Sequence, residues 1–306
     1  MTCRSVTSLQ NNNPMWLESW PAPAKLNLML RIVGQRPDGY HLLQTVFQFV
    51  DLCDWIRFHP VEDGRVTLQT TIPGVPEPDD LTVRAANLLK AETGCQQGVC
   101  IEVEKNLPMG GGLGGGSSDA ATTLLVLNQL WDLQLSIERL MTLGLSLGAD
   151  VPVFVFGHAS WAEGVGEKLE KITIPEQWVI IIRPECHVNT KEIFLSKELT
   201  RDSKSITIAD FIAGQHKNDC ADVVSQRYQS VKDALVDLSQ FSEARLTGTG
   251  SCVFAQFDSK DAAVGAYKAL KDKWQVYLSH GINESPLLSK LKAGNKYSDY
   301  WVVAKR

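Results

Sequence analysis

A glycine-rich run near the middle of the chain has the composition of an anion-binding loop. From Leu107 to Trp131 the sequence reads LPMGGGLGGGSSDAATTLLVLNQLW, where six glycines occupy seven positions before a helical pattern. Glycine lets the backbone approach an anion closely, and a following helix offers unpaired N–H groups and the positive end of its dipole. A flexible linker would carry polar spacers and no adjoining strand, so the run predicts a phosphate site.

Other phosphate-binding and nucleophile motifs fit this chain poorly. The chain contains no Gly-Lys dipeptide, which excludes the Walker A loop. Gly110, Gly112 and Gly115 match G-x-G-x-x-G, but such a match is almost automatic in a glycine run. A dinucleotide fold also needs a second strand after the helix, and here a second helical pattern follows. The glycine run does not contain the nucleophile elbow G-x-S-x-G either.

Two charged residues outside the run could act in acid–base chemistry. Asp150 lies between a helix-stopping Gly148 and Pro152, at a bend where side chains often reach a site. Spacing alone favours a cap or turn aspartate equally well. Lys25 and Asn27 lie two residues apart and therefore share the polar face of a predicted strand. Most such lysines are simply solvated, but Asn27 on the same face indicates a polar wall.

The elements that must position these residues follow from hydrophobic periodicity. Alternation with a period of two predicts strands, and apolar residues three or four apart predict helices. In the first half we expect strands over 21–32, 41–50, 54–60, 65–71, 98–107, 151–157 and 160–173, with helices over 79–93, 117–131 and 136–148. In the second half we expect strands over 178–184, 243–257 (with a tight turn) and 274–282, with helices over 191–197, 219–239 and 259–273.

Composition restricts the class of protein and its location. The chain has 306 residues and a net charge of -5, which argues against nucleic acid as a partner. The N-terminus has no charged region followed by an apolar core, and no run is long enough to cross a bilayer, so we predict a cytoplasmic protein without a membrane partner. Seven scattered cysteines predict free thiols rather than disulfides or zinc ligands.

Three motifs together resemble those of the GHMP kinases, the galactose, homoserine, mevalonate and phosphomevalonate kinases. PMGGGLGGGSSDAA resembles their phosphate loop, while PAPAKLNLML and RLTGTGSCVFAQF resemble their other two motifs, in the right order. The longer stretches RPDGYHLLQTVFQF and LGADVPVFVFGHASWAEGVGE narrow the resemblance to the branch whose acceptor alcohol is a cytidine-diphosphate-linked methylerythritol. Several long motifs occurring together make chance a poor explanation.

The resemblance implies an α+β fold with two domains. The N-terminal domain would be ribosomal-protein-S5-like and the C-terminal domain ferredoxin-like. We expect a disordered leader over 1–15, an N-terminal kinase domain over 16–170, a C-terminal domain over 171–290 and a tail of unknown role over 291–306. The expected assembly is a monomer or a weak homodimer.

The resemblance also implies ATP and Mg²⁺ as cofactors, with transfer of the terminal phosphoryl group to the 2-hydroxyl of the acceptor. Lys25 and Asp150 then correspond to the catalytic pair of the family. Asp150 would accept the hydroxyl proton, while Lys25 would either favour the carboxylate form of Asp150 or stabilise the attacking oxygen and the phosphoryl group. The implied nucleotide-binding residues are Lys105, Pro108, Met109, Gly110, Gly111, Gly112, Leu113, Gly114, Gly115, Gly116, Ser117 and Ser118. Ser117 or Ser118 could instead cap the helix, and Ser118 is the candidate contact to Mg²⁺.

The acceptor would lie between the domains, with its base between aromatic residues. Tyr40 could stack on a pyrimidine and His41 could hydrogen-bond its edge, with Phe194 on the opposite side. The TGTGS stretch would approach the diphosphate, although a tight hairpin turn explains it equally well. The implied acceptor-binding residues are Asn27, Tyr40, His41, Thr190, Phe194, Gly248, Thr249 and Gly250.

One position departs from the family pattern. Asp80 stands where relatives carry asparagine near the adenine, and a carboxylate cannot donate a hydrogen bond as an amide does. Two alternatives to the cytidylyl acceptor stay open. One is a kinase of the same family with another acceptor, and the other is a catalytically inactive nucleotide-binding protein on the same fold.

Overall fold

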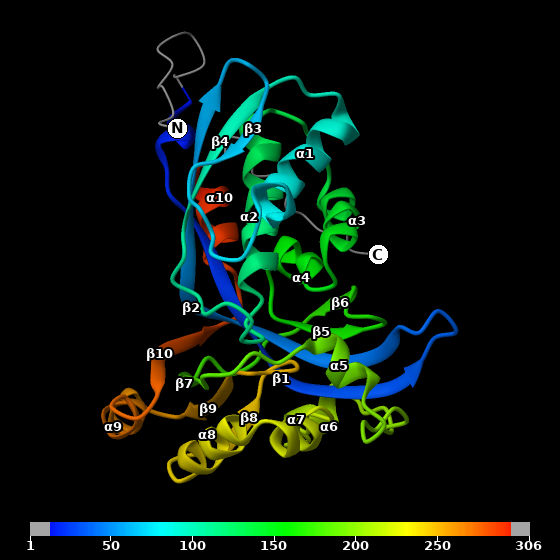
Figure 1. Cartoon of the computed structure of the whole chain (residues 1–306), viewed down its shortest axis with the longest axis vertical. Coiled ribbons are helices and arrows are strands. Elements are labelled where there is room, and N and C mark those ends of the chain that lie inside the picture. Colours follow the sequence, from blue (N-terminus) through cyan, green and yellow to red (C-terminus); the bar gives the residue numbers. More distant parts are fainter. Residues whose placement is uncertain (1–12, 295–306) are drawn as a thin grey trace.

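The computed structural model describes residues 13–294, and within them ten strands form one continuous sheet. Its main path runs β3-β4-β2-β10-β7-β9-β8, with β1 and β5 also paired to β2. Figure 1 shows α1, α2, α3 and α4 on one side of the upper part of the sheet, and α6, α7, α8 and α9 along the lower part. Helices and mainly antiparallel strands confirm the predicted α+β class.

Two long antiparallel strands, β1 (Trp20–Gln35) and β2 (His41–Val61), run through both halves of the molecule. The prediction of two separate strands over 41–60 is wrong, because β2 continues through its two acidic residues. Backbone and side-chain groups of neighbouring elements satisfy both carboxylates. Asp51 accepts from Ser279 and His280, and Asp54 accepts from the N–H groups of Asn106 and Leu107. Because both carboxylates have partners, neither forces the strand to end.

The remaining elements of the upper half follow the predicted order with two exceptions. They are η1 (Pro14–Leu17), β3 (Val66–Leu68), η2 (Glu77–Asp79), α1 (Leu81–Thr93), β4 (Gly98–Glu104), α2 (Gly115–Leu130), α3 (Ile137–Leu147), α4 (Val151–Phe156), β5 (Ser160–Glu163) and β6 (Lys168–Lys171). β3 and β4 pair in parallel across α1. The strand predicted over 151–157 is instead the helix α4, and the single strand predicted over 160–173 is the antiparallel pair β5 and β6.

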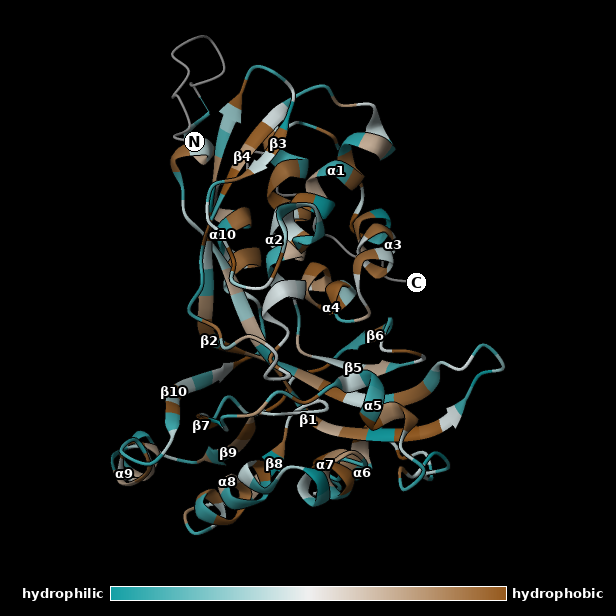
Figure 2. Cartoon of the chain, viewed as in Figure 1, coloured by the Kyte–Doolittle hydropathy of each residue, from teal (hydrophilic) through white to brown (hydrophobic). Residues whose placement is uncertain are grey.

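The helix α4 shows where periodicity fails. VPVFVF is apolar throughout, so its pattern fits a buried strand or a buried helix equally well, and Figure 2 shows this segment as hydrophobic. Pro152 lies in the first turn, where its missing N–H is not needed, and Gly157 ends the helix in the left-handed conformation with φ 69°. α4 packs on α2 and α3, and as a helix it buries apolar side chains on nearly all of its sides.

The lower half contains β7 to β10 and the helices that cover them. These elements are β7 (Trp178–Arg183), α5 (Thr190–Leu195), α6 (Ile208–Ile212), α7 (Ala221–Arg227), α8 (Gln229–Ser239), β8 (Ala244–Leu246), β9 (Val253–Phe257), α9 (Lys260–Leu270) and β10 (Gln275–Ile282). The single helix predicted over 219–239 is wrong. Tyr228 has extended dihedral angles, φ -124° and ψ 94°, and separates α7 from α8.

Three hydrophobic clusters stabilise these layers. The first lies under α1 to α4, the second under α5 and under α7 to α9, and the third between them around β1, β2, β7 and α6. The last described helix, α10 (Pro286–Gly294), returns to the first cluster, where Leu287 and Leu291 are buried. The predicted domain bounds at 170 and 290 stay predictions. Most of the predicted leader and tail lies outside the described residues, although Asn13 caps η1.

The cysteines depart from the prediction at one position. Cys53, Cys95, Cys186, Cys220 and Cys252 are free thiols. Cys100 is disulfide-bonded, contrary to the expectation of free thiols throughout. Burial raises the pKa of the Cys53, Cys220 and Cys252 thiols to about 12, so these three are packing residues rather than nucleophiles.

Candidate functional site

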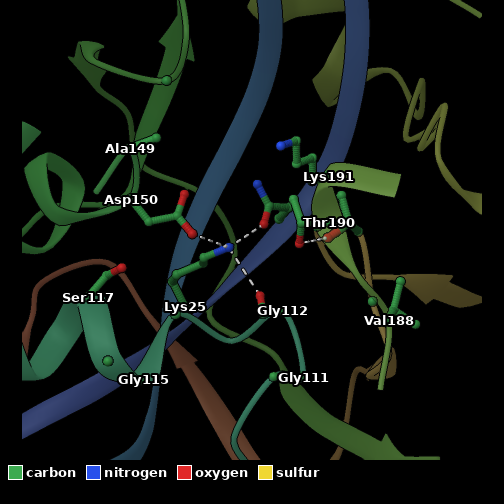
Figure 3. A pocket seen from close by; sticks show the side chains of 18 of the residues that line it. Lys25, Gly111, Gly112, Gly115, Ser117, Ala149, Asp150, Val188, Thr190 and Lys191 are labelled. Carbon is green, nitrogen blue, oxygen red and sulfur yellow. Dashed lines mark hydrogen bonds and ion pairs between the residues drawn. The ribbon is translucent and has the colours of Figure 1, made fainter. Parts of the chain in front are cut away.

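A cavity of about 1130 Å³ lies where the two halves of the molecule meet. The glycine loop, the start of α4, β1, α5 and the β8–β9 loop all contribute to its lining (Figure 3). A single small ligand usually occupies several hundred Å³, so this cavity has room for two ligands side by side. It brings together all the predicted site residues except Leu113 and Ser118.

Lys25 stands at the centre of this cavity, and its ammonium group is held by three acceptors. Nζ donates to Asn27 Oδ1 at 2.6 Å and to the Gly112 carbonyl at 3.1 Å, and it lies 3.3 Å from Asp150 Oδ2. Figure 3 shows the contacts to Gly112 and Asp150 as dashed lines. The residue is only 2% exposed. Lys25 is therefore a fixed charge that joins β1 to the glycine loop and to α4, which sequence spacing could not establish.

Asp150 occupies the N-cap position of α4, but its carboxylate does not cap the helix. No hydrogen bond joins its side chain to the first turn, and the side chain remains 40% exposed on the cavity side. The alternative of a cap aspartate is therefore wrong for the side chain, although the backbone position is a cap. A carboxylate that faces a cavity beside a buried lysine can accept a proton from a bound hydroxyl group.

The glycine loop packs so closely against the β8–β9 loop that position 112 has no room for a side chain. Gly112 has φ 78°, and a Cβ atom there would lie 2.5 Å from the Thr247 carbonyl oxygen. Thr247 Oγ1 accepts a hydrogen bond from the Asn27 N–H group at 3.0 Å. Asn218 Nδ2 donates at 2.9 Å to the carbonyls of Leu246 and Gly248, which fixes the second loop. TGTG is thus both a turn and a wall of the cavity.

The two serines of the run differ in their surroundings. α2 begins at Gly115 with Gly114 as its N-cap, so the predicted serine cap is wrong. Ser117 lines the cavity, whereas Ser118 is fully buried and lies outside the lining, and its hydroxyl has no hydrogen-bond partner within residues 13–294. Leu113 is 1% exposed and belongs to the third hydrophobic cluster. A direct contact from Ser118 or from the Leu113 side chain to a nucleotide is thus not supported, because both side chains are buried.

Lys105 lines the cavity, but two carboxylates already hold its ammonium group. Nζ lies 2.7 Å from Asp119 Oδ2 and also bonds Asp54. Burial opposes the charge on Lys105, but the two carboxylates outweigh burial and raise its pKa. Burial raises the pKa of Asp119 to about 7, with Lys105 opposing and Asp54 reinforcing the shift. The lysine therefore acts first as the counter-ion of a buried acidic pair beneath the start of α2.

Asp119→Asn is expected to flatten the pH dependence of stability. A carboxyl with a raised folded-state pKa binds more protons folded than unfolded between about pH 4 and 7, so stability falls as pH rises through that window. An asparagine removes this term, while Asp54 still neutralises Lys105. The loss of Tm between pH 5 and pH 8, measured by calorimetry, should be smaller in the variant by at least about 2 °C. An equal or larger loss in the variant would disprove the assignment.

Asp80 caps the helix α1 rather than standing free. Its Oδ1 accepts from the Thr82 N–H group at 2.8 Å and from the Thr82 hydroxyl, and the residue is 6% exposed. An aspartate and an asparagine serve equally well as N-caps, so the departure from the family pattern costs the helix nothing. The residue also lines the cavity, next to Leu81 and Thr82.

The predicted base-binding residues lie at the far end of the cavity. Tyr40 follows the β1–β2 turn and is 62% exposed. His41 begins β2 and stacks on Phe194 of α5, with ring centroids 5.0 Å apart and planes inclined by 26°. Thr190 and Thr249 join the two walls through a hydroxyl–hydroxyl contact of 2.8 Å. The structure thus gathers these residues, from three separate parts of the chain, around one space.

Sequence reasoning missed several residues of this cavity. Phe47 of β2 lies under the Lys25 ammonium, 5.5 Å from its ring centroid, and both His187 and Lys191 line the acceptor side. Arg201, which lies outside the cavity lining, contacts His41 and is also absent from the predicted set. Phe47 lies in the stretch RPDGYHLLQTVFQF, which carries part of the family resemblance. No motif marks His187, Lys191 or Arg201, so only their three-dimensional neighbours identify these three.

Within residues 13–294, no group of three or more His, Cys, Asp and Glu side chains could hold a metal ion. Over the same part of the chain, no helix is long and apolar enough to cross a bilayer.

Comparisons with known proteins match the chain to two family models and to relatives of nearly the same length. The model of the GHMP kinases N terminal domain matches residues 80–158, and the model of the GHMP kinases C terminal region matches residues 199–276. The 4-diphosphocytidyl-2-C-methyl-D-erythritol kinase of Nitrosococcus oceani is 56% identical over 273 residues, which cover 89% of this chain and 98% of the relative. The enzyme of the same name from Pseudomonas aeruginosa is 52% identical and covers 90% of this chain and 97% of its own length.

Solved structures show the same two-domain architecture. A crystal structure of 4-(cytidine 5'-diphospho)-2C-methyl-D-erythritol kinase superposes with a TM-score of 0.76 and 29% identity, over 86% of this chain and 99% of that one. A mevalonate kinase superposes with a TM-score of 0.61 and 16% identity, over 87% of this chain and 100% of that one. The second similarity shows the fold alone.

Proposed function

Because the chain belongs to the 4-diphosphocytidyl-2-C-methyl-D-erythritol kinases, a branch of the GHMP kinase family, we propose that the cavity around Lys25 and Asp150 is where it phosphorylates that substrate. The protein is a small-molecule kinase, and ATP is its phosphate donor. The acceptor group would be the 2-hydroxyl, in the non-mevalonate route to isoprenoids. The observation that carries the proposal is the Lys25–Asp150 pair, 3.3 Å apart and facing the glycine loop.

The residues of the glycine loop fit a triphosphate. Gly110, Gly112 and Gly114 have positive φ and bring backbone to the cavity surface without side chains. The first N–H groups of α2 follow directly, with the positive end of the helix dipole. Mg²⁺ would neutralise phosphate charge there, with phosphate oxygens and water as its main ligands and the Ser117 hydroxyl at the edge of the cavity.

The proposed chemistry divides between the two charged residues. Asp150 accepts the proton of the acceptor hydroxyl as its oxygen forms a bond to the terminal phosphorus. The bond from that phosphorus to the bridging oxygen breaks, and its electron pair leaves with ADP. Lys25, whose position three acceptors fix, stabilises the negative charge on the attacking oxygen and the phosphoryl oxygens. A preorganised charge costs no rearrangement during the reaction.

The decisive experiment is a product assay with purified protein, ATP and Mg²⁺. We expect the 2-phosphate of the cytidylyl acceptor and stoichiometric ADP, with mevalonate, homoserine and galactose left unphosphorylated. Turnover of mevalonate in preference would show another acceptor class. Background rates with every alcohol would instead support a nucleotide-binding protein without kinase activity.

Tyr40→Ala is expected to raise the KM for the cytidylyl acceptor about tenfold and to change the KM for ATP by less than about twofold. The tyrosine ring would stack on the base, and base–aromatic stacking contributes about 1–3 kcal/mol. Steady-state kinetics with each substrate varied in turn measures both constants. Tyr40→Phe keeps the ring and should behave like the unmodified protein. A rise in the KM for ATP instead would remove the stacking role.

A further inference from the structure

Arg201 links the aromatic end of the cavity to the segment that follows α5. Its Nε–H group donates to His41 Nε2 at 3.2 Å. Nη1 donates to the Leu199 carbonyl at 3.1 Å, and Nη2 donates to the carbonyls of Phe194 at 2.9 Å and Ser196 at 2.7 Å. All three guanidinium nitrogens therefore have protein partners, and the side chain is fixed.

These contacts determine which nitrogen of His41 carries the proton. A guanidinium group only donates, so His41 Nε2 must accept. The neutral ring then carries its hydrogen on Nδ1. Burial, followed by the Arg201 charge, lowers the pKa of His41, so the neutral form prevails at neutral pH. Among the described residues none forms a hydrogen bond with Nδ1, which leaves one N–H donor on a residue that lines the cavity.

The same arginine also fixes the ring that stacks on His41. Phe194 packs on the imidazole at a centroid distance of 5.0 Å, and Arg201 holds the Phe194 carbonyl. His41 belongs to the start of β2 and Phe194 to α5, so one guanidinium group connects two elements that are far apart in the sequence. The orientation of both rings thus depends on a side chain outside the cavity lining.

We propose that Arg201 is a positioning residue for base selection: it holds His41 as the Nδ1–H tautomer against Phe194, so that the site accepts cytosine and disfavours uracil. A cytosine ring presents a bare N3 that accepts a hydrogen bond, whereas uracil carries N3–H, and two donors facing each other repel. The inference rests on the proposed function, because it takes the acceptor to carry a pyrimidine nucleotide at this end of the cavity. It adds the residue that sets the tautomer of His41 and so leaves its Nδ1–H group as the donor.

The first test compares Arg201→Met with Arg201→Lys and with a matched control. Arg227 donates to the Ser196 hydroxyl at 2.6 Å and to Glu198 at 2.9 Å, so Arg227→Met loosens the same segment without touching His41. With Arg201→Met we expect the KM for the cytidylyl acceptor to rise about tenfold, with kcat and the KM for ATP within twofold. The preference in kcat/KM for the cytidine over the uridine form of the acceptor should fall about tenfold. Arg201→Lys should lie between, and Arg227→Met should match the unmodified protein.

The second test reads the tautomer directly in the full-length protein. With ¹⁵N-labelled histidine, the two-bond nitrogen–proton spectrum should show His41 as the Nδ1–H form in the unmodified protein and in Arg227→Met. In Arg201→Met it should show a mixture with the Nε2–H form. An unchanged tautomer and an unchanged base preference in Arg201→Met, or an equal effect of Arg227→Met, would overturn the proposal. Failure of the unmodified protein to phosphorylate the cytidylyl acceptor would count against the proposed function instead, while the tautomer assignment would still be read from the spectrum.

Discussion

Asp150→Asn is expected to lower kcat by about a thousandfold while the Kd for ATP changes less than about threefold. General-base catalysis contributes roughly 10²–10⁴ in rate, and an amide of the same size cannot take up the hydroxyl proton. The side chain does not cap α4, so the fold should not suffer from the change. Single-turnover kinetics measures the chemical step, and calorimetry with ATP measures the affinity.

A matched carboxylate provides the control for this experiment. Asp79 is exposed and lines the same cavity, but it makes no ion pair with Lys25. Asp79→Asn should leave kcat within about threefold, since it removes one negative charge from the cavity without touching the catalytic pair. Near-normal turnover by Asp150→Asn, or an equal loss in both variants, would remove the role that we assign to Asp150.

Gly112→Ala is expected to lower kcat/KM by about a hundredfold and to destabilise the protein by at least about 2 kcal/mol. Alanine with positive φ costs about 1 kcal/mol. In addition, the new Cβ would lie 2.5 Å from the Thr247 carbonyl and 3.0 Å from the Gly250 carbonyl, so one of the two loops must move. The Gly112 carbonyl accepts from Lys25, and a displacement of about 1 Å in a catalytic group costs about 10²-fold in rate.

Gly94 separates the effect of backbone conformation from that of close approach. It ends α1 with φ 71°, and a Cβ atom there would meet no atom within 4 Å. Gly94→Ala should therefore cost about 1 kcal/mol in chemical unfolding and leave kcat/KM unchanged. If Gly112→Ala lost no more stability and activity than Gly94→Ala, the contact between the two loops would not position the catalytic lysine.

Much of the local structure could be predicted from residue types and periodicity. The alternation over 21–32 predicted β1, and the position of the glycine run predicted a loop between a strand and a helix, because these signals depend on neighbours in the chain. The errors fall where a local signal is ambiguous. VPVFVF is apolar throughout and became the helix α4, and the helix predicted over 219–239 is broken at Tyr228.

The sequence by itself therefore determined the α+β class, the glycine loop and the candidate residues Lys25 and Asp150. Only the tertiary structure decided that Lys25 binds Asp150 and the Gly112 carbonyl, that Lys105 neutralises Asp54 and Asp119, and that Arg201 orients His41. The physical reason is separation along the chain. These partners are between 14 and 160 residues apart. Their contacts arise from the packing of separate elements, so no local pattern of residues predicts them.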